Sequence, residues 1–135
     1  LTLVLAIGAT ESYAQCKVFT KRDCIPQISP YINNGQFNGA TLFAGESASL
    51  IMTFYSGQDY RLLVCAQPAI KGAYFVVKDA TGNALYNSKE GAKNFWDFNV
   101  ATTQQMEIEV TVPDAEGSGG VKPNGCVSIL LGFKE

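Results

Sequence analysis

Histidine is absent from the 135 residues of the chain. Its absence removes the side chain that most often acts as a general base and as a metal ligand. Charged residues are also scarce, at 16%, and ten basic against twelve acidic residues leave a net charge of −2. A protein that binds the phosphates of nucleic acid needs a surplus of lysine and arginine, so we expect no nucleic-acid partner.

Motifs of the common nucleophilic and phosphate-binding enzymes are missing as well. The chain has no G-x-S-x-G, no S-x-x-K and no glycine loop followed by lysine and a helix. These absences predict a protein that is not an enzyme. One alternative is a secreted hydrolase whose carboxylate pair comes from Asp97, Glu107 and Glu109. Outward positions on alternating strands explain these carboxylates more simply.

The chain has an apolar start that is too short to span a bilayer, which takes about 20 residues. The first ten residues, LTLVLAIGAT, are nearly all apolar, and Ser12 and Ala14 occupy the −3 and −1 positions of a cut after Ala14. This pattern predicts that residues 1–14 are the remnant of a secretory signal and that residues 15–135 form a single domain. We therefore expect a secreted, periplasmic or cell-surface protein with no transmembrane segment in the mature chain.

Two other interpretations of the start remain. Residues 1–7 also suit a buried first strand, since they form a continuous apolar run. Cys16 is the second residue after the proposed cut and could carry a lipid, but Gln15 and Tyr13 stand where a lipid-attachment site has a small and an aliphatic residue.

Four cysteines remain after such a cut: Cys16, Cys24, Cys65 and Cys126. An even number in an exported chain predicts two disulfides, and no two lie close enough in sequence for a typical zinc site. Cys65 lies near the end of one expected strand and Cys126 at the start of another, and each is on the face opposite the main apolar stripe of its strand. If these strands are antiparallel neighbours, we expect Cys65 to pair with Cys126 and Cys16 with Cys24. An N-terminal segment that reaches over to Cys65 or Cys126 is the alternative.

Apolar residues recur at every second position along much of the chain, and no segment keeps a helical period. This alternation predicts antiparallel strands with one face in a core. The expected strands are Ser49–Tyr55, Tyr60–Ala66, Ala73–Lys78, Phe95–Val100, Gln105–Val112 and Cys126–Phe133. Short strands at about ten-residue spacing, separated by glycine turns, predict an all-β fold with a single antiparallel β-sandwich.

A weaker signal supports a jelly-roll arrangement. The segment Val77-Lys78-Asp79-Ala80-Thr81-Gly82-Asn83-Ala84-Leu85-Tyr86 is similar to the D-x-x-G-x-x-L hairpin of two domain families. Residues 45–133 resemble the bacterial pre-peptidase C-terminal domain and the GOLD domain. The resemblance implies an eight-stranded jelly-roll sandwich that acts as an accessory, non-catalytic module of exported proteins, with no catalytic residues to carry over.

Two long segments outside the alternating runs are expected to be loops. Pro113–Gly125 is rich in glycine and has little side-chain bulk. Ile25–Gly39 carries two prolines and three asparagines, so we expect it to be irregular and to cross one end of the sandwich. It also holds the candidate binding residues Tyr31, Asn33, Asn34 and Phe37, because aromatic rings beside amides suit a sugar or a peptide.

A calcium site is the one metal site that the composition allows. Asp79, Asn83, Asp114 and Glu116 are oxygen donors in expected turns and loops, and calcium prefers oxygen ligands. Solvated turn residues explain them equally well, so we assign no ligand set and expect no other cofactor.

These observations predict a small exported, non-catalytic β-sandwich that acts as a binding or assembly module at the bacterial cell surface or in the periplasm. Its partner is expected to be a protein or a glycan. A structural subunit of an envelope or extracellular assembly is the alternative, besides the carboxylate hydrolase.

Overall fold

The computed structural model describes residues 16–91, 93–114 and 122–134, and for residues 34–37 the backbone alone. The predicted signal remnant and most of the predicted second loop lie outside the described residues. Elements in the described part are η1 (Thr20–Cys24), η2 (Ile25–Ile28), β1 (Ile32–Phe43), β2 (Ser47–Phe54), β3 (Asp59–Ala66), β4 (Tyr74–Lys78), β5 (Ala84–Asn87), α2 (Ser88–Gly91), β6 (Phe95–Phe98), β7 (Gln104–Thr111) and β8 (Asn124–Lys134).

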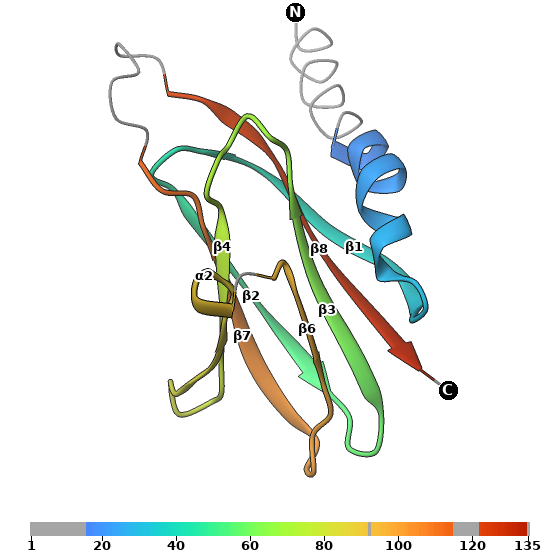
Figure 1. Cartoon of the computed structure of the whole chain (residues 1–135). Helices are drawn as coiled ribbons and strands as arrows, with labels where there is room; N and C mark the ends of the chain where they lie inside the picture. Colours follow the sequence, from blue (N-terminus) through green and yellow to red (C-terminus); the bar gives the residue numbers. More distant parts are fainter. Residues whose placement is uncertain (1–15, 92, 115–121, 135) are drawn as a thin grey trace, which may run out of the picture.

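The described strands form two four-stranded antiparallel sheets that face each other (Figure 1). Sheet A has the order β1-β8-β3-β6, and sheet B has the order β2-β7-β4-β5. The chain changes sheet at every connection except β4 to β5, so that β8 is inserted between β1 and β3, and β7 between β2 and β4. This is the order of a jelly roll made of two Greek keys. The predicted all-β antiparallel sandwich is confirmed.

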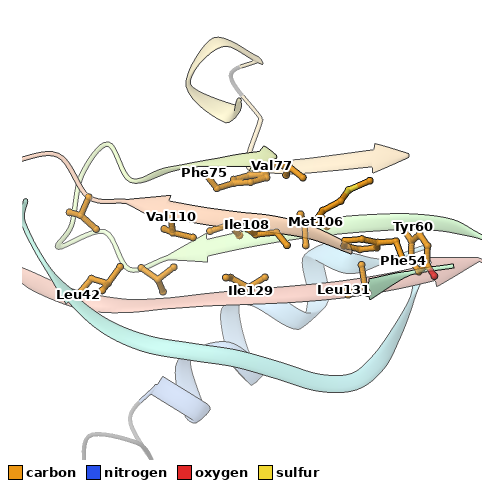
Figure 2. Packing of buried hydrophobic residues seen from close by; sticks show 14 of the residues in the cluster. Leu42, Phe54, Tyr60, Phe75, Val77, Met106, Ile108, Val110, Ile129 and Leu131 are labelled. Carbon is orange, nitrogen blue, oxygen red and sulfur yellow. The ribbon is translucent and has the colours of Figure 1, made fainter. Parts of the chain in front are cut away.

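The alternating pattern produces the main core between the sheets. In β7, Met106, Ile108 and Val110 are buried, while the glutamates between them are only half-buried on the outer face of sheet B. Figure 2 shows how side chains of the two sheets meet in one apolar layer. Its largest fully buried members are Phe54, Phe75, Leu62, Ile108, Val77, Val110 and Val112.

A second core lies on the other face of sheet A. Residues 16–31, which we name the N-terminal strap, run through a helical turn at 16–19 into η1 and η2 and lie against β3 and β8 (Figure 1). Phe19 and Ile28 of the strap are buried against Leu63 and Leu130, which point outward from sheet A. β3 and β8 are therefore buried on both faces, and this explains their long runs of buried residues.

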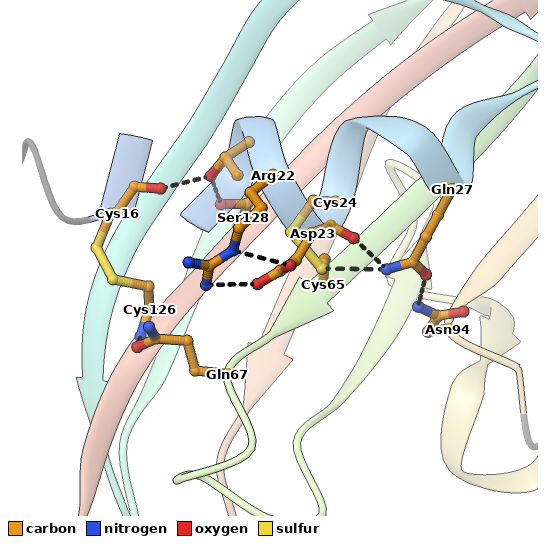
Figure 3. The surroundings of a disulfide bond; sticks show 11 residues. Cys16, Arg22, Asp23, Cys24, Gln27, Cys65, Gln67, Asn94, Cys126 and Ser128 are labelled. Carbon is orange, nitrogen blue, oxygen red and sulfur yellow. Dashed lines mark hydrogen bonds and ion pairs between the residues drawn. A yellow bond between two sulfur atoms is a disulfide. The ribbon is translucent and has the colours of Figure 1, made fainter. Parts of the chain in front are cut away.

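Two disulfides fasten the strap to the two central strands of sheet A (Figure 3). Cys16 is bonded to Cys126 of β8, with Cα atoms 5.4 Å apart, and Cys24 is bonded to Cys65 of β3, with Cα atoms 5.8 Å apart. No cysteine among the described residues is free. Cys24 lies eight positions after Cys16 in mostly helical chain, so both side chains face the sheet.

The prediction that Cys65 pairs with Cys126 and Cys16 with Cys24 is wrong. Its premises hold, because β3 and β8 are antiparallel neighbours and both cysteines are on the face opposite the main core. The register of the two strands prevents this disulfide, because Cys65 lies opposite Ser128, two positions from Cys126. Residues in such a diagonal relation are about 7–8 Å apart, too far for a disulfide. The alternative, in which the N-terminal segment reaches over to both, is confirmed.

A hydroxyl pair and a glycine allow the strap to lie close to β8. Thr20 Oγ1 donates a hydrogen bond to the carbonyl of Cys16 at 2.8 Å and is hydrogen-bonded to Ser128 Oγ, and both hydroxyl residues are fully buried. At Gly132, an added Cβ would lie 2.7 Å from Ile28 Cγ1 and 2.9 Å from Tyr31 Cβ. Gly132 thus gives the strap the room that any side chain would fill.

The expectation that Ile25–Gly39 is an irregular loop is also wrong. Its first part forms η2, with Pro26 at the start, where a missing N–H does no harm. From Ile32 onward it is strand β1, paired with β8. The asparagines are tolerated because β1 is an edge strand with a register shift between Asn33 and Phe37, and edge positions impose weak residue preferences.

The disulfide pairing makes the first testable prediction. Peptide mapping of the non-reduced protein should recover Cys16 with Cys126 and Cys24 with Cys65. Because the closed loops span 110 and 41 residues, replacing either pair by serine should lower the free energy of unfolding by about 2–5 kcal/mol in urea titrations. A fragment that joins Cys65 to Cys126 would contradict the structure.

Gly132→Ala tests the seating of the strap. The added methyl meets Ile28 and Tyr31 at sub-van-der-Waals distance, so we expect a loss of about 1–3 kcal/mol of stability. Ile28→Ala removes one of the two clashing groups, and the double variant should lose less than the sum of the single losses. Strictly additive losses would show that the two residues are not in contact.

Candidate binding surfaces

Tyr31 lies at the end of the strap, on the outer face of sheet A. Its ring is half-buried and rests against the guanidinium of Arg61 in β3, with the Arg61 Cζ 4.7 Å from the ring centroid. The same guanidinium lies 4.3 Å from the ring centroid of Phe95 in β6. One cation thus contacts two aromatic rings that are 64 residues apart in sequence, and each contact is favourable because the ring face carries negative potential.

A carboxylate holds this guanidinium in place. Arg61 Nε and Nη2 donate to the two oxygens of Asp97 at 2.7 and 2.8 Å, and Nη1 donates to the carbonyl of Ser29 at 3.2 Å. The hydrogen bonds to Asp97 raise the pKa of Arg61 above its ordinary value. The side chain of Arg61 is only 15% exposed, so its position is well constrained by strap and sheet together.

Two lysines complete the group. Lys134 Nζ lies 4.9 Å from the Tyr31 ring centroid, and Lys93 Nζ lies 5.6 Å from that of Phe95; both lysines are exposed. We name this cluster of Tyr31, Arg61, Lys93, Phe95 and Lys134 the Tyr31 face. It carries three cations, of which Arg61 is paired with Asp97 and Lys134 lies opposite Asp59 in the register of β3 and β8. The remaining positive charge suits a partner that brings an acidic group.

The other candidate binding residues do not gather around Tyr31 in a loop. Asn33 lies in β1 opposite Gly132. Asn34 and Phe37 also belong to β1, but their side chains lie outside the described part of the chain. The structure thus places Tyr31 on a built surface and leaves the roles of Asn33, Asn34 and Phe37 as predictions.

A groove runs along the open side of the sandwich, between the edge strands β1 and β2; we name it the seam. One cavity of about 340 Å³ and another of about 420 Å³ lie in it, and they share Asn38 and Leu50 as lining residues. The remaining lining is largely apolar, with Leu42, Val110, Val127 and Ile129 in the first cavity and Met52, Tyr60, Leu131 and Phe133 in the second. Such sizes and linings are typical of sites for uncharged groups.

Exposed apolar side chains occur on both strands that border the seam. Six large apolar residues are exposed among the described side chains. Four of them belong to the two seam strands or follow directly: Ile32, Phe43, Ile51 and Tyr55. Ile51 and Tyr55 are more than half exposed, at 65% and 61%. Phe43 and Ile51 alternate with the inward-facing Leu42 and Leu50, so these two side chains lie on the outer faces of the two sheets.

Three of the four candidate calcium donors lie in the described part of the chain. Asp79 Oδ1 accepts hydrogen bonds from the backbone N–H and the hydroxyl of Thr81 and from the backbone N–H of Asn83, at 2.7–3.0 Å. These bonds lower the pKa of Asp79 and close a turn in which Gly82 has a φ of +89°. Asp114 faces Lys122 at 3.7 Å, and Glu116 lies outside the described residues. The described part of the chain brings together no group of three acidic or cysteine ligands.

The carboxylates of the alternative hydrolase are divided between the sheets. Asp97 is on the outer face of sheet A, paired with Arg61. Glu107 and Glu109 are on the outer face of sheet B, where Glu109 lies 3.5 Å from Lys78. The whole core separates Asp97 from the two glutamates, so Asp97 cannot join either of them in a catalytic pair.

Comparisons with known proteins bear on the fold. No family model and no curated protein sequence matches the chain. Among solved structures, the chain is similar to PliG of Aeromonas hydrophila, a periplasmic lysozyme inhibitor of g-type lysozyme. The TM-score is 0.55 at 10% identity, over 78% of this chain and 89% of that one. This likeness shows a shared fold, and the resemblance to the pre-peptidase C-terminal and GOLD domains stays a prediction.

Sequence reasoning missed Arg61 and the seam. Arg61 is the one charged residue between Tyr60 and Cys65, in the otherwise apolar run of β3. A single charge within such a run was the sequence feature that could have marked Arg61 as a candidate. The seam depends on which strands form the sheet edges, which requires the topology. In the described part, no helix has both the length and the apolar character needed to cross a membrane.

The Asp79 turn makes a pH-dependent prediction. Because its pKa is lower in the folded than in the unfolded chain, the carboxylate stabilises the fold at pH values above its unfolded pKa of about 3.9. That contribution is lost as the pH falls through the folded pKa. Asp79→Asn should therefore lower the Tm at pH 7, and the difference from wild type should shrink as the pH falls below about 3.9. A difference that persists unchanged at low pH would contradict this assignment.

Proposed function

We propose that the chain is an exported, non-catalytic binding module whose partner is a protein. Its two disulfides suit an oxidising compartment outside the cytoplasm. Its fold is shared with a periplasmic protein that binds and inhibits an enzyme. The bridges close a small sandwich into a rigid scaffold, which is what a binding module needs in order to present a preorganised surface.

The observation that carries the proposal is the Tyr31 face. Tyrosine and arginine are the residues most often responsible for binding energy at protein interfaces. Here Arg61 is held by Asp97, by the Ser29 carbonyl and by two rings, so binding would cost little side-chain entropy. The exposed Lys93 and Lys134 add positive charge at its rim, where charge mainly speeds association.

The same contacts favour a protein over a glycan. A sugar would need a free aromatic face on which to stack. Arg61 and Lys134 lie over the ring of Tyr31, and Arg61 and Lys93 lie over that of Phe95. A protein surface with carboxylates can instead pair with the exposed Lys93 and Lys134 directly. A lysozyme is the first partner class to test, since the structural neighbour inhibits a g-type lysozyme.

The test titrates the purified chain into a panel of lysozymes that includes g-type enzymes. Binding is followed by calorimetry and inhibition by the loss of lytic activity. We expect binding to at least one of them, with affinity that falls as salt rises. An oligosaccharide that binds the Tyr31 face in place of any lysozyme would overturn the protein-partner proposal.

Tyr31→Ala and Lys134→Ala locate the interface. Each should weaken binding about tenfold, equivalent to about 1.4 kcal/mol, while the Tm stays within a few degrees. The chain offers a matched control, because Lys89 Nζ lies 5.1 Å from the ring centroid of Tyr74 in a similar pair on sheet B. Tyr74→Ala and Lys89→Ala should leave affinity unchanged. Equal effects of both pairs would show that the Tyr31 face is not the interface.

A further inference from the structure

The edges of the two sheets differ in how well they are protected against strand pairing. β5 and β6 are only four residues long. β1 has twelve residues and β2 has eight, and neither contains a charged residue or a proline. Charges, prolines and short length are the usual means by which proteins keep edge strands from pairing with other chains. The two strands that border the seam lack all three.

A strand added to β1 would bury part of its side chains in the seam. A strand that pairs with β1 extends sheet A by about 4.8 Å and points every second side chain toward sheet B. Those side chains would lie over the cavities, where Asn38, Ala40 and Leu42 already point from β1 and Leu50 from β2. The small residues Gly39 and Ala40 leave the backbone of β1 accessible at this point.

The lining of the two cavities determines which side chains an added strand can place there. No charged residue lines either cavity. A charged side chain placed there would lose its hydration without gaining a partner, which is costly. Uncharged, apolar side chains at alternate positions of the occupant fit the lining.

A second copy of the chain fits less well than a free segment. The side chains that β1 presents toward the seam are Asn38, Ala40 and Leu42, and Leu42 is already buried in its own core. A second β1 would therefore bring an amide and a methyl group to cavities of about 340 and 420 Å³. An unfolded segment can bring bulky apolar side chains instead.

We propose that β1 binds an extended, uncharged segment of a partner protein by strand addition, with apolar side chains at alternate positions entering the seam. This inference rests on the proposed function and names the chemistry of one partner element. Main-chain hydrogen bonds to β1 supply affinity, and the two cavities supply specificity, as in other cases of strand addition.

The test uses an N-acetylated, C-amidated nonapeptide in which valine alternates with serine. A peptide of identical composition with its valines consecutive is the control. We expect the alternating peptide to bind at least tenfold tighter, and amide exchange to slow within residues 38–42 on binding. Equal binding of the two peptides, or protection that falls elsewhere, would overturn strand addition at β1.

Variants test the role of the seam. Asn38→Lys and Ala40→Lys place a charge on the face of β1 that lines the cavities and should each weaken peptide binding at least tenfold. Leu85→Lys is the matched control, because Leu85 is 42% exposed on β5 at the far edge of sheet B. If Ala40→Lys does not fold, Asn38→Lys and the exchange data on the unaltered protein still decide the question.

Sedimentation and acyl-chain binding complete the test. A dimer of the unaltered protein that Ala40→Lys dissociates would assign β1 to a second copy and overturn the proposal. Saturable binding of a fatty acid that displaces the peptide from the seam would do the same. Lysozyme binding through the Tyr31 face, with no peptide binding, would refute this inference and leave the proposed function standing.

Discussion

Burial of β3 and β8 on both faces is the constraint on which the rest of the structure depends. One face of each strand packs into the core between the sheets, and the other packs under the N-terminal strap. A strap of sixteen residues (16–31) buries too little apolar surface to stay in place by packing alone. The disulfides to Cys126 and Cys65 hold it, one on each central strand.

This arrangement decides where a partner can bind. The outer face of sheet A is covered by the strap except near its end, where Tyr31 meets Arg61 and Phe95. The jelly-roll order makes the first strand of the chain an edge strand and opens the seam beside it. Both candidate surfaces therefore flank the strap and β1.

The sequence predicted the strands that alternate and failed where register or edges decide. Met106, Ile108 and Val110 identified β7 because only one face of that strand is buried. Cys65 and Cys126 were placed on the correct face, but an offset of two register positions, which alternation cannot reveal, set their partners. β1 was missed because its asparagines and glycines suit a loop equally well, and only pairing with β8 makes them a strand.

Hydrogen exchange of the oxidised protein, read residue by residue, tests the doubly buried centre most directly. The account predicts that amides of β3, β8 and η1 exchange only by global unfolding, since strap and sheet form one cooperative unit. Reduction of both disulfides should release η1 first and then weaken protection in β3 and β8. An η1 that exchanges freely in the oxidised protein, while β3 and β8 keep full protection, would contradict the account.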